Sequence, residues 1–171
     1  MGVLNVHYSL LPKYRGATPL EASLLAGDTE TGVTIQKMVK ALDAGDILAQ
    51  ERVAIDAADT ARELRPKLIT LGADLLVRTL PSYLNGEITP VAQDHTLASR
   101  AGKLKKEDGL LDLSGSARDN WNKYRAYADT IGTHLFKDGK RIKIISASFK
   151  NGIFTPLRVI PEGKKETQYE G

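Results

Sequence analysis

The stretch that decides the fold is residues 4–12, which read LNVHYSLLP. Its first four residues alternate apolar and polar side chains, a pattern typical of a β-strand. Asn5 and His7 are two positions apart, so their side chains leave the same face of that strand. The chain must leave the sheet at residues 9–12, and polar residues at the carboxyl end of an α/β strand occupy the usual place for a site. We therefore predict a site at Asn5 and His7, although an isolated Asn-x-His is more often a structural pair.

The sequence on the carboxyl side of this strand predicts a mixture of helices and strands. Residues 18–26 have helical character, with Pro19 suited to the first turn and Gly27 to the end. Residues 32–38 are rich in β-branched side chains, and residues 47–55 have a similar pattern. Both segments are therefore predicted to be strands.

A longer helix is predicted after Thr60. The sequence TARE at residues 60–63 matches a capping box, in which the first and last residues satisfy backbone groups at the helix start. Leucines then recur at helical spacing, at positions 64, 68, 71, 75, 76 and 80. We interpret these leucines as core residues.

The remaining sequence indicates a linker and a second domain. Residues 89–107 show little periodicity, so we place a linker there between a first domain at 1–88 and a second at 108–171. In the second domain Ser116 is suited to cap a helix. The pairs Asp138-Gly139 and Asn151-Gly152 are strong hairpin signals, because both residues of such a turn must tolerate positive φ. Short strands at this spacing predict a small β-barrel.

Composition excludes several classes of protein. The 171 residues are 42% apolar and 26% charged, which is ordinary for a soluble globular protein. The absence of cysteine excludes disulfides, thiolate zinc sites and a cysteine nucleophile, and it fits a reducing, cytoplasmic compartment. No apolar run approaches the roughly 18 residues needed to cross a bilayer, and residues 1–7 do not resemble a signal peptide.

Charge is unevenly distributed between the two halves. Residues 1–100 contain 10 Lys and Arg against 12 Asp and Glu, whereas residues 101–171 contain 14 against 9. A basic second half is compatible with an anionic partner such as a nucleic-acid backbone, although a solvated lysine-rich surface explains the composition more simply.

A third candidate site residue is Asp43, in the sequence LDAGDI at residues 42–47. Gly45 would let the backbone approach a ligand closely. By itself this Asp-x-Gly is a weak signal, because such turns are common.

Together, three ordered segments resemble the folate-dependent formyltransferases. They are NVHYSLLPKYRGATP at residues 5–19, GDTETGVTI at residues 27–35 and LDAGDIL at residues 42–48. Within this family the chain is most similar to the members that act on methionyl-tRNA, because residues 103–109 and 156–165 resemble the entry and the final segment of their C-terminal domain. The resemblance implies a partial Rossmann-like catalytic domain followed by a small OB-like β-barrel that helps to hold tRNA.

The resemblance also implies a mechanism. Formyl transfer from 10-formyltetrahydrofolate to an amine passes through a tetrahedral oxyanion, to which Asn5 and His7 would donate hydrogen bonds. Asp43 would hold the imidazole, favour its charged form and help to move the proton of the amine. No metal is implied. Contacts to the folate co-substrate are expected from Ser9, Leu10, Leu11, Pro12, Ala44 and Gly45, and Arg15 is a candidate contact to the initiator methionyl-tRNA. A solvated loop explains Arg15 about as well.

The sequence also departs from the family pattern. Relatives carry the first half of the catalytic domain before the Asn-x-His strand, and Tyr8 stands where many have proline. Because a Rossmann-like domain is built on a parallel sheet whose central strands need neighbours, we expect the chain alone to be a truncated, monomeric product with little or no activity. The alternatives are a sugar-nucleotide formyltransferase, a formyltetrahydrofolate hydrolase, a residual tRNA-binding module without catalysis, or a fragment with no independent role.

Overall fold

The first part of the chain is built around a three-stranded sheet. A computed structural model describes residues 2–170. Strands β1 (Leu4–His7), β3 (Glu30–Lys37) and β4 (Ile47–Ala54) lie in the order β1-β3-β4. All three predicted strands are therefore confirmed. Each pairing in this sheet is antiparallel, so the parallel pairing expected of a Rossmann-like sheet is not formed among these three strands.

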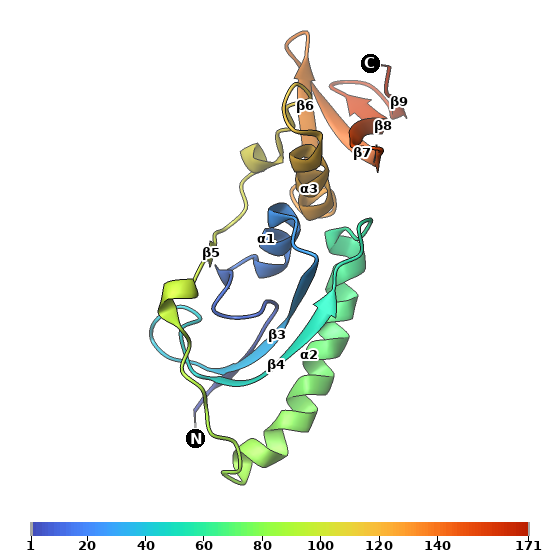
Figure 1. Cartoon of the computed structure of the whole chain (residues 1–171). Helices are drawn as coiled ribbons and strands as arrows, with labels where there is room; N and C mark the ends of the chain where they lie inside the picture. Colours follow the sequence, from blue (N-terminus) through green and yellow to red (C-terminus); the bar gives the residue numbers. More distant parts are fainter. Residues whose placement is uncertain (1, 171) are drawn as a thin grey trace.

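Two helices pack against this sheet, as Figure 1 shows for the long helix α2 (Ala61–Leu84), which runs beside β3 and β4. Helix α1 (Pro19–Ala26) has Pro19 in its first turn and ends at Gly27, whose φ of 72° is left-handed. The capping box predicted at the start of α2 is present, with Thr60 and Glu63 satisfying each other's backbone groups. Both helices were thus predicted correctly from end signals that act within a few residues.

The predicted leucine stripe forms part of the first hydrophobic cluster. Leu64 and Leu68 are fully buried, and Leu75 is almost so. They pack with the buried faces of α1 and β3, through residues that include Leu24, Val33 and Ile35. By contrast Leu80 is 38% exposed, so the stripe leaves the core near the carboxyl end of α2.

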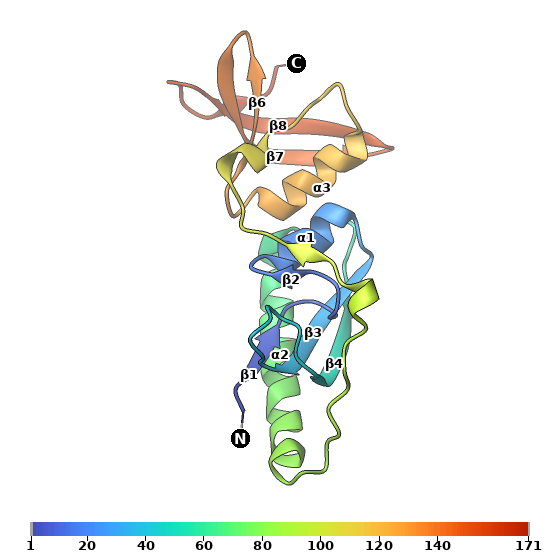
Figure 2. The same ribbon diagram turned by 90° about the vertical axis from the view of Figure 1, so that its left-hand side faces the viewer.

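The connecting segment, residues 85–116, runs back along the first unit from the far end of α2 toward the second unit (Figure 2). It contains the short helices η1 (His95–Leu97) and η2 (Lys106–Gly109) and the two-residue strand β5 (Arg100–Ala101). Strand β5 pairs in parallel with β2 (Arg15–Gly16). The linker predicted at 89–107 lies in this segment, and the proposed domain boundaries stay a prediction.

The second unit combines one helix with an antiparallel sheet. Helix α3 (Ala117–Tyr127) is capped by Ser116, as predicted. It packs against a sheet in the order β6-β7-β8-β9, whose strands are β6 (Thr133–Lys137), β7 (Lys140–Lys150), β8 (Ile153–Pro161) and β9 (Thr167–Gln168). Both hairpin turns are confirmed, because Asp138, Gly139, Asn151 and Gly152 all have positive φ. The mixed α/β class followed by a small β domain is confirmed.

Helix α3 joins the two units. Trp121 and Tyr124 belong to a second hydrophobic cluster with the β-sheet, whereas Ala126 and Tyr127 belong to the first cluster. The buried Arg125 donates through Nη1 to the carbonyl oxygens of Asp56 and Asp59, at 3.5 and 3.4 Å. Within residues 2–170, no helix is both long enough and apolar enough to cross a membrane.

Candidate active site

Asn5 and His7 lie on β1 directly opposite β3. Asn5 pairs with Gln36, and His7 pairs with Thr34. His7 is only 4% exposed, while Asn5 is half-buried. The period-two geometry of the strand therefore turns both side chains to the same side, as the sequence predicted.

Asp43 reaches these two residues from the loop at residues 38–46, which we call the Asp43 loop. Its Oδ1 lies 3.5 Å from Asn5 Nδ2 and 3.7 Å from His7 Nδ1. The same oxygen accepts a hydrogen bond from Gln36 Nε2 at 2.9 Å, and Oδ2 accepts one from the backbone N–H of Gly16 at 2.8 Å. The three residues that the sequence singled out as catalytic are thus brought together around one carboxylate.

This carboxylate faces a cavity of about 620 Å³, which we call the central cavity. Asn5, His7 and Asp43 all line it. The rest of its wall comes mainly from β2 and the connecting segment, through Arg15, Gly16, Arg100, Ala101, Gly102 and Lys103. The wall thus combines an amide donor, a titratable ring and three cationic side chains, a set suited to an anionic or oxyanionic ligand.

The protonation of His7 follows from its surroundings. Burial lowers the pKa of His7, and it outweighs the nearby Asp43 carboxylate and the Tyr14 carbonyl, which both act to raise the pKa. His7 Nε2 lies 3.1 Å from the carbonyl oxygen of Tyr14, so in the neutral ring Nε2 carries the hydrogen and donates it there. The lone pair is then on Nδ1, next to Asp43. Donation from Nδ1 to a ligand therefore requires the imidazolium form.

The residues predicted to contact the folate co-substrate do not gather in the central cavity. Ser9 is fully buried, and its hydroxyl donates to the carbonyl of Lys13 at 2.6 Å. Leu10, Leu11 and Pro12 line a separate cavity of about 460 Å³ with residues of β3 and β4. Ala44 and Gly45 belong to the Asp43 loop but line neither of these two cavities. The binding role of all six residues stays a prediction.

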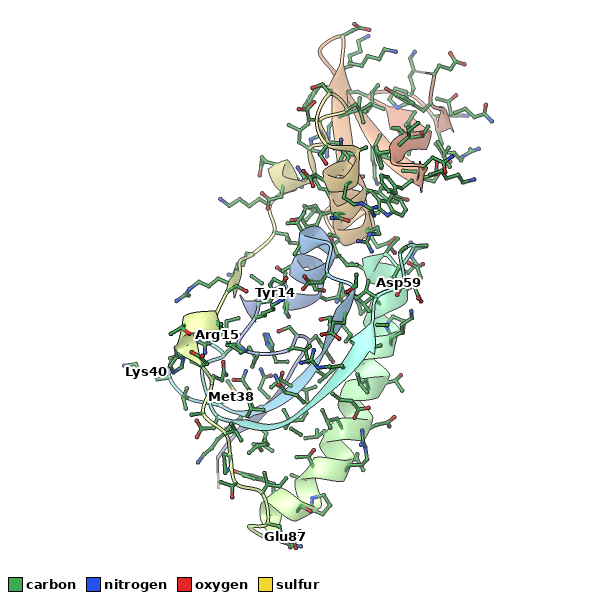
Figure 3. All side chains as sticks on the ribbon, viewed as in Figure 1. Tyr14, Arg15, Met38, Lys40, Asp59 and Glu87 are labelled. Atoms are coloured by element: carbon green, nitrogen blue, oxygen red, sulfur yellow. The ribbon has the colours of Figure 1, made fainter. Side chains whose placement is uncertain are left out.

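Arg15 lines the central cavity, but its guanidinium is also engaged with the connecting segment. Its Nε and Nη2 donate to Gln93 Oε1 at 3.1 and 2.6 Å, and Nη2 lies 2.9 Å from His95 Nδ1. Figure 3 shows Arg15 beside η1, the helix that carries His95. Arg15 therefore links β2 to a segment that the sequence indicated only as a linker.

Sequence reasoning missed the contribution of the connecting segment to this site. Arg100 and Lys103 line the central cavity, and Gln93 contacts the Asp43 loop. The only local signal was the presence of two basic residues in a polar stretch without periodicity. Nothing in the sequence around them indicates that β5 returns to pair with β2.

Comparison with known proteins identifies the family. A protein-family model described as formyl transferase matches residues 1–80. A second family model, described as formyl transferase, C-terminal domain, matches residues 103–166. The chain belongs to the formyltransferase family.

Comparison with curated proteins shows which members of the family this chain resembles. The chain is 42% identical over 162 residues to a methionyl-tRNA formyltransferase of Streptococcus mutans, and 45% identical over 156 residues to one of Treponema pallidum. These alignments cover 95% and 91% of this chain, but 52% and 49% of the relatives. The chain thus spans about half the length of the curated relatives it matches.

Solved structures share the fold. An N-formyltransferase from Helicobacter canadensis superposes with a TM-score of 0.76 at 23% identity, covering 87% of this chain and 55% of that protein. A methionyl-tRNA formyltransferase from Clostridium thermocellum gives a TM-score of 0.66 at 18% identity, covering 99% of this chain and 70% of that protein.

Proposed function

We propose that the protein containing this chain transfers a formyl group from 10-formyltetrahydrofolate to the amino group of methionyl-initiator tRNA. The observation that carries the proposal is the meeting of Asn5, His7 and Asp43 at the central cavity. It is supported by identity above 40% to relatives named methionyl-tRNA formyltransferase over more than nine-tenths of the chain.

The first step to be catalysed is attack of the amine nitrogen on the formyl carbon, which places negative charge on the formyl oxygen. Asn5 Nδ2 is a neutral donor to that oxygen, and His7 becomes a second, charged donor through Nδ1–H once Nδ1 has taken up the proton of the attacking amine. A preorganised donor of this kind stabilises the transition state by about 3–4 kcal/mol. Asp43 accepts from Asn5 and Gln36 and so fixes the side on which the amide hydrogens lie.

The second requirement is the transfer of one proton. An α-amino group has a pKa of about 7.7–8.0, so an appreciable neutral fraction is present at neutral pH. As the new C–N bond forms, the amine nitrogen gives its proton to the lone pair of His7 Nδ1. The adjacent Asp43 stabilises the imidazolium that results. The same proton then moves to N10 of the folate as its bond to the formyl carbon breaks, so His7 returns to the neutral form.

The cationic part of the cavity wall supports a tRNA acceptor. Arg15, Arg100 and Lys103 line the same cavity as Asn5 and His7. Cationic side chains in the wall of the same cavity suit the phosphates at the aminoacylated end of a tRNA. The basic balance of residues 101–171 extends the positive charge beyond the cavity.

The proposal is tested on the protein that contains this chain, supplied with 10-formyltetrahydrofolate labelled in the formyl group. Methionyl-initiator tRNA, an amino-sugar nucleotide and water are the competing acceptors. We expect the label on the methionyl amine, with a rate that falls steeply as salt is raised because phosphate contacts release counterions. Label released as formate would indicate a hydrolase. Binding of tRNA with no formyl product would favour a non-catalytic module and contradict the proposal.

A sugar-nucleotide acceptor is the second candidate, and a specific observation favours it. The Helicobacter canadensis structure with a TM-score of 0.76 is described as a complex with folinic acid and dTDP-3-aminofucose. Its identity of 23% is far lower than the 42–45% of the methionyl-tRNA relatives. Label on the amino sugar in the competition assay would establish this alternative.

A further inference from the structure

Gln93 lies in the connecting segment, yet its side chain is only 6% exposed. Its Nε2 donates to the carbonyl oxygens of Asp43 and Gly45, at 2.9 and 2.7 Å. Its Oε1 accepts both hydrogen bonds from the Arg15 guanidinium. The two N–H groups and two lone pairs of the carboxamide are therefore all engaged. Three segments that are distant in sequence meet at this one side chain.

Other hydrogen bonds also hold the Asp43 loop: Met38 N–H donates to the Val3 carbonyl at 2.8 Å, the Asp46 carbonyl accepts from Lys37 N–H at 2.9 Å, and the Asp43 carboxylate accepts from Gln36 and Gly16. None of residues 38–46 lies in a helix or strand, and residues 38–42 are exposed. Figure 3 shows Lys40 on the outer side of the molecule. Asp43 itself has a φ of 48°, a conformation that residues other than glycine rarely adopt. The loop is therefore held by polar contacts rather than by buried apolar surface, and Gln93 provides two contacts to its main chain.

The position of this loop fixes the chemistry of the site. The Asp43 carboxylate lies 3.7 Å from His7 Nδ1, and a shift of the loop changes that separation directly. Misplacement of a reacting group by about 1 Å reduces rates on the order of 10²-fold. Gln93, which donates hydrogen bonds to the main chain at residues 43 and 45, is thus placed to set the separation between the Asp43 carboxylate and the His7 imidazole.

We propose that Gln93 is a positioning residue, which sets the separation between the Asp43 carboxylate and the His7 imidazole by fixing the Asp43 loop to Arg15. This inference rests on the proposed function, because it concerns the same site. It adds a role for a residue 50 positions away from Asp43, in a segment whose sequence predicts only a linker.

The test measures His7 by NMR titration of its imidazole protons in the 171-residue chain. His134, in the second unit, serves as the internal reference, and the variant His7→Gln identifies the signal. Asp43 acts to raise the pKa of His7, whereas burial lowers it. Withdrawal of the loop in Gln93→Met, which is neutral and similar in size, is therefore expected to lower the pKa further. The fall should be smaller than that in Asp43→Asn, which removes the charge entirely.

The double variant separates positioning from a general change in packing. In the Asp43→Asn background the carboxylate is absent, so Gln93→Met should no longer move the His7 titration. Arg15 loses its acceptor in both backgrounds, and Arg100 and Lys103 are unchanged, so their effects cancel in the comparison. Gln168→Met, at an exposed position on β9, is the matched control and should leave His7 unaffected.

Two results would overturn the inference. One is an equal fall in the pKa of His7 when Gln93→Met is made in the unmodified chain and in Asp43→Asn. The other is an unchanged His7 titration in a folded Gln93→Met variant. If circular dichroism shows that Gln93→Met does not fold, Gln93→Asn takes its place in the same cycle, because its amide is one methylene too short to keep both carbonyl contacts. The titration needs no formyl donor, so its outcome is independent of whether the proposed transfer is observed.

Discussion

At the scale of single residues, the site is organised around the Oδ1 atom of Asp43. Gln36 Nε2 donates to it at 2.9 Å, and the side chains of Asn5 and His7 lie at 3.5 and 3.7 Å. Gln36 is almost completely buried, and its Oε1 has no hydrogen-bond partner among the described residues. An unpaired buried oxygen is unfavourable. It is tolerated here because the opposite amide orientation would place that oxygen against the Asp43 carboxylate.

The role of Asn5 can be tested by removing its amide. In the protein that contains this chain, Asn5→Ala eliminates one neutral donor to the oxyanion, so we expect the rate of formyl transfer to fall about 10²–10³-fold. Initial rates at saturating formyl donor measure the effect. Asn85→Ala, at an exposed position after α2, is the matched control and should retain the full rate. A loss of less than about threefold in Asn5→Ala would remove Asn5 from this role.

The lowered pKa of His7 predicts how stability depends on pH. In the unfolded chain His7 titrates near its ordinary value of 6.5, and in the folded protein its pKa is lower. Between these two values the unfolded state binds more protons, so stability falls as the pH drops below 6.5 and levels off below the folded-state pKa.

His7→Gln should reduce the dependence of the free energy of unfolding on pH below 6.5, as measured by urea denaturation across the acidic range. Burial also lowers the pKa of His134, so both proteins are compared in a His134→Gln background. If the free energy of unfolding depends on pH equally with and without His7, folding does not lower the pKa of this ring.

At the scale of elements, local end signals determine where the helices begin. Thr60 accepts a hydrogen bond from the backbone of Arg62, and Glu63 accepts one from the backbone of Thr60 at 2.9 Å. These contacts satisfy backbone groups that have no partner inside α2. The turn that leads into α2 supplies the Asp56 and Asp59 carbonyls that receive Arg125 of α3. The capping box thus supports the junction between the two units.

Thr60→Ala removes this cap and should lower the free energy of unfolding by about 1 kcal/mol. The measurement is the shift of the urea midpoint at constant slope. Thr70→Ala, at an exposed position inside the same helix, is the control and should be neutral or slightly stabilising, since alanine has the higher helix propensity. Equal effects at the two positions would contradict a capping role.

At the scale of the whole molecule, the two hydrophobic clusters share one helix. Tyr127 of α3 is buried in the first cluster, whereas Trp121, six residues earlier, is buried in the second. The indole Nε1–H of Trp121 also donates to the carbonyl oxygen of Ala57 at 3.2 Å. Opposite faces of α3 therefore belong to different cores. This arrangement predicts that the two units unfold together.

The single tryptophan allows a test of this coupling, because Trp121 fluorescence reports on the second cluster while far-ultraviolet circular dichroism reports on the whole chain. We expect coincident urea transitions by the two probes. Tyr127→Ala should remove about 3–5 kcal/mol and separate the transitions. Phe136→Ala, at a 58% exposed site, is the control that should keep them together. Separate transitions in the unmodified chain would show that α3 does not couple the clusters.

Features that depend on neighbouring residues could be predicted from the order of the amino acids. The alternation at Asn5 and His7, the TARE capping box after which α2 begins, and the Asn151-Gly152 turn all act through contacts within a few positions. The proximity of Asp43 to Asn5 and His7 followed from a family resemblance rather than from spacing. The distances agree with it, while the catalytic roles stay a prediction.

The long-range packing of the folded chain determined which distant residues complete the site. Gln93 reaches the Asp43 loop, and Arg100 and Lys103 line the central cavity, because β5 returns to pair with β2 across more than 80 residues of sequence. It also decided that α3 buries two faces in two cores. The physical reason is that local preferences fix an element's type and ends. Its partners depend on which pairing of distant surfaces buries the most apolar area and satisfies the most polar groups.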